Sequence, residues 1–303
     1  GQTEVFHYPN AQNATTLWYH DHALGISRLN IQMGLAGFYL IRDPSEDAQY
    51  PLPSGAYEIP LLIQDRSFNK DGTLLYPNRT CSNDHSISCT TDAQCGPAST
   101  CAARYCRLNA NVACSSDATC SALTPGDTCK PIWQEHFFGN TILVNGTVWP
   151  VKHVDRARYR FRLLNGSNSR TYQLHLEVDL DHDGTPESPP PRFVQVGTDG
   201  GLMYGQPVTT DEITLMPSER ADVVIDFARN LDLAYPAGTE IFLKNTAPAP
   251  FPGIPDVGVV PDVLKFVVGA QSASNPLPST LPNVPAAHLP IRRALCHRRI
   301  PRA

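Results

Sequence analysis

The sequence predicts an all-β protein, and two observations support that prediction. Several short runs alternate polar with apolar residues, as in 158–165, which is the period of a half-buried strand. Turn residues separate these runs: the chain has 28 prolines and 20 glycines, and an Asn145-Gly146 turn lies between two apolar stretches at 139–150. Together they indicate an antiparallel β-sandwich or barrel. The alternating arginines of 158–165 are expected on its solvated face.

The first predicted strand with candidate functional residues is 16–25. It carries two histidines two residues apart, His20 and His22. Residues i and i+2 of a strand point to the same face, so the two imidazoles are expected side by side. Such a pair suits copper, zinc, iron or nickel, and the spacing alone does not choose among them. A second strand is predicted at 34–44, ending in a turn marked by Pro44.

Residues 45–56 are rich in polar residues, proline and glycine, which is typical of a linker between domains. A second β domain is then predicted to begin at Tyr57 and to continue to about residue 270. Beyond it, 271–290 is again rich in proline and reads as another linker.

Eight of the nine cysteines lie between Cys81 and Cys129 and interrupt the second β domain. They form two copies of a four-cysteine unit, in which CTTDAQC (89–95) corresponds to CSSDATC (114–120). Few apolar residues are available for a core. The chain contains no CxxC pair, which disfavours zinc binding. We therefore expect disulfides, whose pairing the spacing leaves open, and an oxidising compartment.

Asp179, Asp181 and Asp183 alternate before Gly184, as at the start of a calcium-binding loop. The position of the last carboxylate ligand in such a loop is Pro190, and no helical pattern flanks the segment. A polar hairpin loop is the favoured interpretation, with calcium as the alternative.

The segment LWYHDHALGISRLNIQMGLAGFYLIRDP (17–44) resembles the second copper motif of multicopper oxidases, specifically bacterial laccases of the spore-coat and bilirubin-oxidase type. Four later runs resemble the middle domain of the same enzymes and follow in the family's order: GNTILVNGTVWP (139–150), YRFRLLNGSNSRTY (159–172), VGTDGGL (196–202) and LMPSERADVVIDF (215–227). The Cys81–Cys129 segment has no counterpart in this resemblance and is interpreted as an insertion.

The resemblance implies cupredoxin-like Greek-key β-sandwich domains. Residues 1–44 would be the C-terminal part of a first cupredoxin domain, 57–270 a middle domain with the 81–129 insertion, and 271–303 a linker with an atypical tail. It also implies that His20 and His22 each bind one copper of the type 3 pair. The resemblance further implies that the full enzyme would hold four coppers and would couple oxidation of phenols, bilirubin-like pigments or metal ions to reduction of O2 to water.

Since the chain begins with Gly and matches only this motif, we expect the start of the first domain and the third domain to be missing, and the chain alone to be inactive. Cys296-His297, in a basic tail, lacks the surrounding motif of a copper ligand pair. The net charge of −5 argues against nucleic acid as a partner, and no apolar run is long enough to span a membrane. The insertion suggests an extracellular or periplasmic location.

Two other functions compete with the oxidase. One is a non-enzymatic cupredoxin-type binding or structural protein in which the cysteine-rich insertion is the working part. The other is an unrelated zinc or iron enzyme that uses His20 and His22. The identity of the bound metal would distinguish the zinc or iron enzyme from the oxidase.

Overall fold

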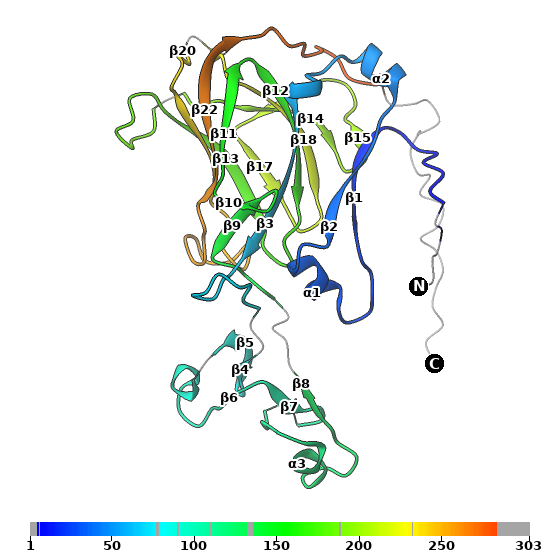
Figure 1. Ribbon diagram of the computed structural model, residues 1–303, viewed down its shortest axis with the longest axis vertical. Coiled ribbons are helices and arrows are strands. Elements are labelled where there is room, and N and C mark those ends of the chain that lie inside the picture. Colours follow the sequence, from blue (N-terminus) through cyan, green and yellow to red (C-terminus); the bar gives the residue numbers. More distant parts are fainter. Residues whose placement is uncertain are drawn as a thin grey trace, which may run out of the picture.

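Two β-sheets packed face to face form the main body of the protein (Figure 1). The computed structural model describes residues 5, 7–76, 79–89, 91–109, 111–131, 136–187, 189–231 and 233–283. The larger sheet contains, in spatial order, β10 (Thr147–Val148), β9 (Thr141–Val144), β3 (Glu58–Arg66), β12 (Arg158–Asn165), β18 (Arg220–Asp226), β14 (Phe193–Thr198) and β15 (Gly201–Leu202), with β16 (Val208–Thr210) also paired to β14. The smaller sheet contains β11 (Val151–Arg156), β22 (Asp262–Ser272), β21 (Glu240–Asn245), β13 (Tyr172–Asp179) and β17 (Glu212–Leu215). A short ribbon pairs β19 (Arg229–Asn230) with β20 (Leu233–Ala234).

The core between the sheets follows from the two-residue period of the strands. Along β13, Leu174 and Leu176 are buried while His175 between them is partly exposed. Phe161 and Phe227, from the larger sheet region, pack against Phe266 of β22 with ring centroids 5.4 and 4.9 Å away. The all-β prediction is thus confirmed.

The sheets are mixed and not purely antiparallel. β3 pairs in parallel with β12, and β11 pairs in parallel with β22, while the other ladders are antiparallel. Parallel neighbours need a long connection, and the chain supplies one in each case. The cysteine-rich insertion lies within the connection from β3 to β12.

A hairpin of β1 (Thr15–His20) and β2 (Ala36–Ile41) packs beside the larger sheet, with α1 (Ser27–Gln32) between its strands. Figure 1 shows this hairpin next to β15. Thr16 connects the two parts, because its hydroxyl accepts a hydrogen bond from Arg162 Nη1 at 2.8 Å and its carbonyl accepts one from Arg220 Nε at 3.0 Å. The strand predictions at 16–25 and 34–44 are confirmed for the part of each segment that pairs.

The predicted solvated face of β12 is wrong. Arg160 and Arg162 are each 5% exposed. The neighbouring strands place carboxylates on the same face: Asp222 binds Arg160 through its Nε at 2.9 Å, and Glu58 binds Arg162 at 2.5 Å. The hairpin covers this face, so Arg160 and Arg162 form a buried layer of ion pairs between hairpin and sandwich, while the Arg158 side chain remains 40% exposed.

The two predicted linkers pack against the sandwich. Part of 45–56 is helical, in α2 (Pro44–Gln49) and the 3-10 turn η1 (Gly55–Tyr57). Asp43 caps α2 by accepting from Ser45 N at 2.8 Å, and Pro44 takes the first helical position. Leu52 and Leu281, one from each linker, join a small apolar cluster with Val196 and Val224.

The cysteine-rich insertion forms two small units of the same design, which Figure 1 shows beyond one end of the sandwich. The disulfides are Cys81–Cys95 and Cys89–Cys101 in the first unit, and Cys106–Cys120 and Cys114–Cys129 in the second. The first unit contains β4 (Thr80–Cys81), β5 (Asp84–Ser88), η2 (Asp92–Cys95) and β6 (Cys101–Ala102), and the second contains β7 (Arg104–Cys106), α3 (Asp117–Ser121) and β8 (Cys129–Pro131).

The two units repeat in contacts as well as in sequence. Asp92 accepts a hydrogen bond from Cys101 N, and the corresponding Asp117 accepts one from Cys129 N. The disulfide prediction is therefore confirmed, and each unit pairs its first cysteine with its third and its second with its fourth. None of the helices in the described part of the chain is long and apolar enough to cross a membrane.

Candidate metal centre

The two histidines lie at the end of the β1–β2 hairpin where the connection through α1 begins. His20 is the last residue of β1 and is opposite Ala36 of β2, so it is held by the ladder. His22 follows two residues after the strand ends, in the loop that leads into α1. The prediction that both lie on one strand therefore holds only for His20.

The rings nevertheless share one side of the segment. The ring centroids of His20 and His22 are 5.8 Å apart, with 32° between the ring planes. Trp18, two residues before His20 on the same face, has its ring centroid 4.4 Å from that of His20. His20 is partly buried and His22 is exposed. An open groove of about 770 Å³, lined in part by Trp18 and His20, lies alongside.

One hydrogen bond fixes the tautomer of His20. Its Nδ1 lies 2.6 Å from the carbonyl oxygen of Asp21. A carbonyl only accepts, so Nδ1 carries the proton and donates. The lone pair of the neutral ring is then on Nε2, which is the nitrogen free to bind a metal.

The side chain of Asp21 closes the loop that contains His22. One carboxylate oxygen accepts from Ala23 N at 3.1 Å and lies 3.5 Å from the hydroxyl of Ser27, the first residue of α1. The same hydroxyl lies 3.1 Å from the Asp21 carbonyl oxygen. The other carboxylate oxygen of Asp21 is buried and has no hydrogen-bond partner among the described residues. Asp21 is thus built into the loop.

The predicted calcium segment forms a hairpin loop after β13. Oxygens of Asp179, Asp181 and Glu187 come within 4.8 Å of one another, while Asp183 instead accepts from Thr185 N at 2.7 Å. Asp179 already accepts from His182 N at 2.7 Å and from Gly184 N at 3.1 Å. Glu187 lies near these aspartates because it forms an antiparallel β-bridge with Val178. The spacing of residues in the sequence does not predict this contact.

Two other histidines lie on strands of the smaller sheet. His153 is exposed on β11, and His175 of β13 lies with its Nε2 3.1 Å from the carboxylate of Glu177. Cys296-His297 lies outside the described residues.

Two residues that contact α1, the helix that follows His20 and His22, were not predicted from the sequence. Arg66, the last residue of β3, donates to the carbonyl of Ile31 in α1 at 2.8 Å, and Asn168 donates to the carbonyl of Arg28 at 3.1 Å. Each lies in a run that resembles an ordinary strand or turn, and no spacing links either one to His20.

Comparison with known proteins points to one family. The family model described as "Multicopper oxidase" matches residues 1–46. A laccase of Bacillus stratosphericus is 41% identical over 246 residues, which cover 81% of this chain and 37% of that protein. The multicopper oxidase LPR1 of Arabidopsis thaliana is 33% identical over 287 residues, covering 93% of this chain and 39% of that protein.

Solved structures agree with the sequence comparisons. The multicopper oxidase McoA of Aquifex aeolicus matches with a TM-score of 0.60 at 28% identity, covering 90% of this chain and 45% of that one. The sandwich is accordingly cupredoxin-like. The chain spans less than half the length of these relatives.

Proposed function

Because this chain belongs to the multicopper oxidase family, we propose that His20 and His22 bind copper and supply ligands of a coupled binuclear, type 3 pair. The observation that carries the proposal is the bond from His20 Nδ1 to the Asp21 carbonyl, which leaves Nε2 free. The His22 ring at 5.8 Å gives a second imidazole on the same side. Imidazole nitrogen is a good ligand for copper.

The whole protein is proposed to be a laccase-like oxidase. Copper would supply one-electron redox chemistry that links a reducing substrate to dioxygen, which is reduced by four electrons to water. Phenols, bilirubin-like pigments and metal ions are the proposed classes of reducing substrate. Within this chain, Asp21 and Trp18 orient the His20 ring, and the β1–β2 ladder fixes its backbone.

The remaining copper ligands are proposed to lie outside these 303 residues, in the rest of the first domain and in a third domain. We accordingly expect no turnover from this chain alone. The support is the coverage of the relatives, since this chain matches 37% of the Bacillus stratosphericus laccase.

An extracellular or periplasmic location is proposed from the four disulfides, which persist in oxidising compartments. Calcium binding near Asp179 stays a prediction. The Asp179 carboxylate already accepts two backbone hydrogen bonds, which compete with a bound cation.

Oxygen consumption tests the oxidase proposal. The longer gene product that contains this chain, loaded with copper, should consume O2 in the presence of a phenol, with four substrate electrons for each O2. His20→Gln with His22→Gln should abolish consumption, because the type 3 pair loses two ligands. His153→Gln, at an exposed histidine on β11, is the matched control and should leave the rate unchanged. Undiminished O2 consumption in the double variant would refute the proposal.

A further inference from the structure

Two side chains of the sandwich hold α1, the helix that follows the histidine loop. Arg66 Nη2 lies 2.8 Å from the carbonyl oxygen of Ile31 in the last turn of α1. Asn168 Nδ2 lies 3.1 Å from the carbonyl oxygen of Arg28 and 3.4 Å from Oε1 of Gln32. The Ile31 carbonyl also accepts from Gly34 N at 3.0 Å, so Arg66 adds a second hydrogen bond at the end of α1, while Asn168 binds a carbonyl in its first turn.

Arg66 is unusual for a buried cation. It is 3% exposed, and burial lowers its pKa despite the opposing effect of nearby Asp65. Among the described residues it forms no ion pair, and its guanidinium hydrogen bonds go to the carbonyls of Asp65, at 2.8 Å, and of Ile31. A buried charge is unfavourable unless it is well hydrogen-bonded, so the contact to α1 is part of what makes this position tolerable.

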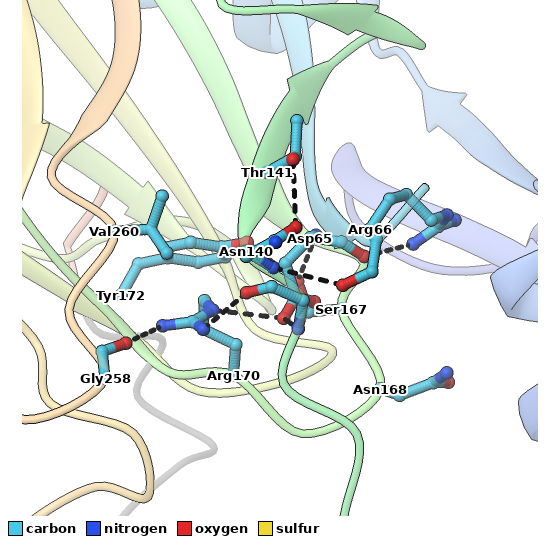
Figure 2. Close-up of polar contacts among 12 residues, drawn as sticks. Asp65, Arg66, Asn140, Thr141, Ser167, Asn168, Arg170, Tyr172, Gly258 and Val260 are labelled. Atoms are coloured by element: carbon cyan, nitrogen blue, oxygen red, sulfur yellow. Dashed lines mark hydrogen bonds and ion pairs between the residues drawn. The ribbon is translucent and has the colours of Figure 1, made fainter. Parts of the chain in front are cut away.

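A second network ties the two anchoring residues together (Figure 2). Asp65, next to Arg66, donates its backbone N–H to the hydroxyl of Ser167, next to Asn168, at 3.1 Å. The Asp65 carboxylate pairs with Arg170 at 3.0 Å, and both side chains are almost wholly buried. Figure 2 shows Arg66 and Asn168 on the side of this network away from Arg170. Both donors therefore project from one rigid base.

The contacts continue from α1 to the segment that contains His20 and His22. Ser27, at the start of α1, has its hydroxyl 3.1 Å from the Asp21 carbonyl oxygen. That same oxygen accepts the proton of His20 Nδ1 at 2.6 Å. The place of α1 thus sets the place of the acceptor that orients the His20 ring.

We propose that Arg66 and Asn168 are positioning residues for His20, acting through α1, Ser27 and the Asp21 carbonyl to keep Nε2 free for a metal. The inference rests on the proposed copper-binding role of His20. It adds that the correct tautomer depends on the sandwich and is not a property of the hairpin alone.

The tautomer can be measured in the metal-free 303-residue chain. Imidazole nitrogen shifts of the chain labelled with 15N-histidine distinguish Nδ1–H from Nε2–H, and His20→Gln assigns the signal. We expect His20 to be Nδ1–H in the wild type and a mixture of tautomers in Arg66→Met with Asn168→Ala. The single variant Arg66→Lys should keep the wild-type shifts, since an ammonium group can also donate to the Ile31 carbonyl. Arg192→Met, at an exposed arginine, should change nothing.

Titration with Cu2+ provides the second readout, and the double variant should bind about tenfold more weakly than the wild type. Should Arg66→Met fail to fold, Asn168→Ala alone, at a partly exposed side chain, still gives the shift comparison. A His20 signal that stays Nδ1–H in the anchor variants overturns the positioning role. A wild-type chain whose His20 signal does not respond to Cu2+ overturns the proposed function instead, and the tautomer comparison still decides the positioning role.

Discussion

At the scale of single residues, the buried charges differ sharply from the exposed ones. The side chains of Arg170 and Asp65 are 2% and 0% exposed, and Arg170 also donates to the carbonyls of Gly139 and Gly258. This one guanidinium joins β3, the chain returning from the cysteine-rich insertion, and the loop before β22. By contrast, the Arg192–Asp211 pair is largely in solvent.

Removing these two arginines should therefore have unequal effects. Arg170→Met leaves the Asp65 carboxylate buried without its cation, and the free energy of unfolding should fall by about 3–5 kcal/mol. Arg192→Met should lower it by less than about 1 kcal/mol. Urea unfolding followed by fluorescence measures both. Equal losses in the two variants would contradict the assignment of Arg170 as a buried connector.

Glu58 gives a prediction about acid. Burial alone would raise its pKa, but the guanidiniums of Arg162 and Arg42 outweigh that effect and lower the pKa below the ordinary value of 4.5. A carboxyl group with a lowered pKa stabilises the fold above its unfolded pKa, and this contribution is lost as the pH falls through the folded pKa.

Glu58→Gln should accordingly be less stable than the wild type at pH 7, with a difference that shrinks as the pH falls below 4.5. Urea unfolding at several pH values tests this expectation. Glu212→Gln, at an exposed position, is the control and should differ little from the wild type throughout. A difference for Glu58→Gln that grows in acid would have the wrong sign.

At the scale of elements, the cysteine-rich units depend on their disulfides. The buried core of the first unit consists of Cys81, Cys89, Cys95 and Cys101. Removing the Cys89–Cys101 disulfide, whose sequence separation is 12, should reduce the stability of that unit by about 3 kcal/mol.

We expect Cys89→Ser with Cys101→Ser to expose residues 79–102 to a non-specific protease while 104–131 and the sandwich remain resistant. Mapping the first cleavage sites by mass spectrometry gives the answer. Cleavage that begins in the sandwich would show that the unit and the sandwich unfold together, contrary to this prediction.

The predictability of the elements has a physical limit. Alternation in β13 and the turn at Asn145-Gly146 are local signals, so the strands were predictable. The burial of Arg160 was not, because it depends on Asp222, 62 residues away in sequence. Glu187 joined the Asp179 loop for the same reason, through a contact across a hairpin.

At the scale of the whole molecule, the hairpin and the sandwich act as one support for the histidine segment. His20 and His22 were identified from their spacing and from the resemblance of 17–44 to a copper motif. Their supporting contacts were not, since Arg66 and Asn168 reach α1 from positions 35 and 140 residues away from the residues whose carbonyls they bind. Sequence periodicity reports which face of a strand is apolar, and it carries no information about which carbonyl a side chain will reach.

The central claim, that His20 and His22 are the copper ligands of this chain, has a direct test. Cu2+ is paramagnetic and broadens the NMR signals of the groups it binds. The chain has ten histidines, and substoichiometric Cu2+ added to the chain labelled with 15N-histidine should broaden the signals of His20 and His22 before the other eight. Broadening that begins at other histidines, or that affects all ten alike, would contradict the account.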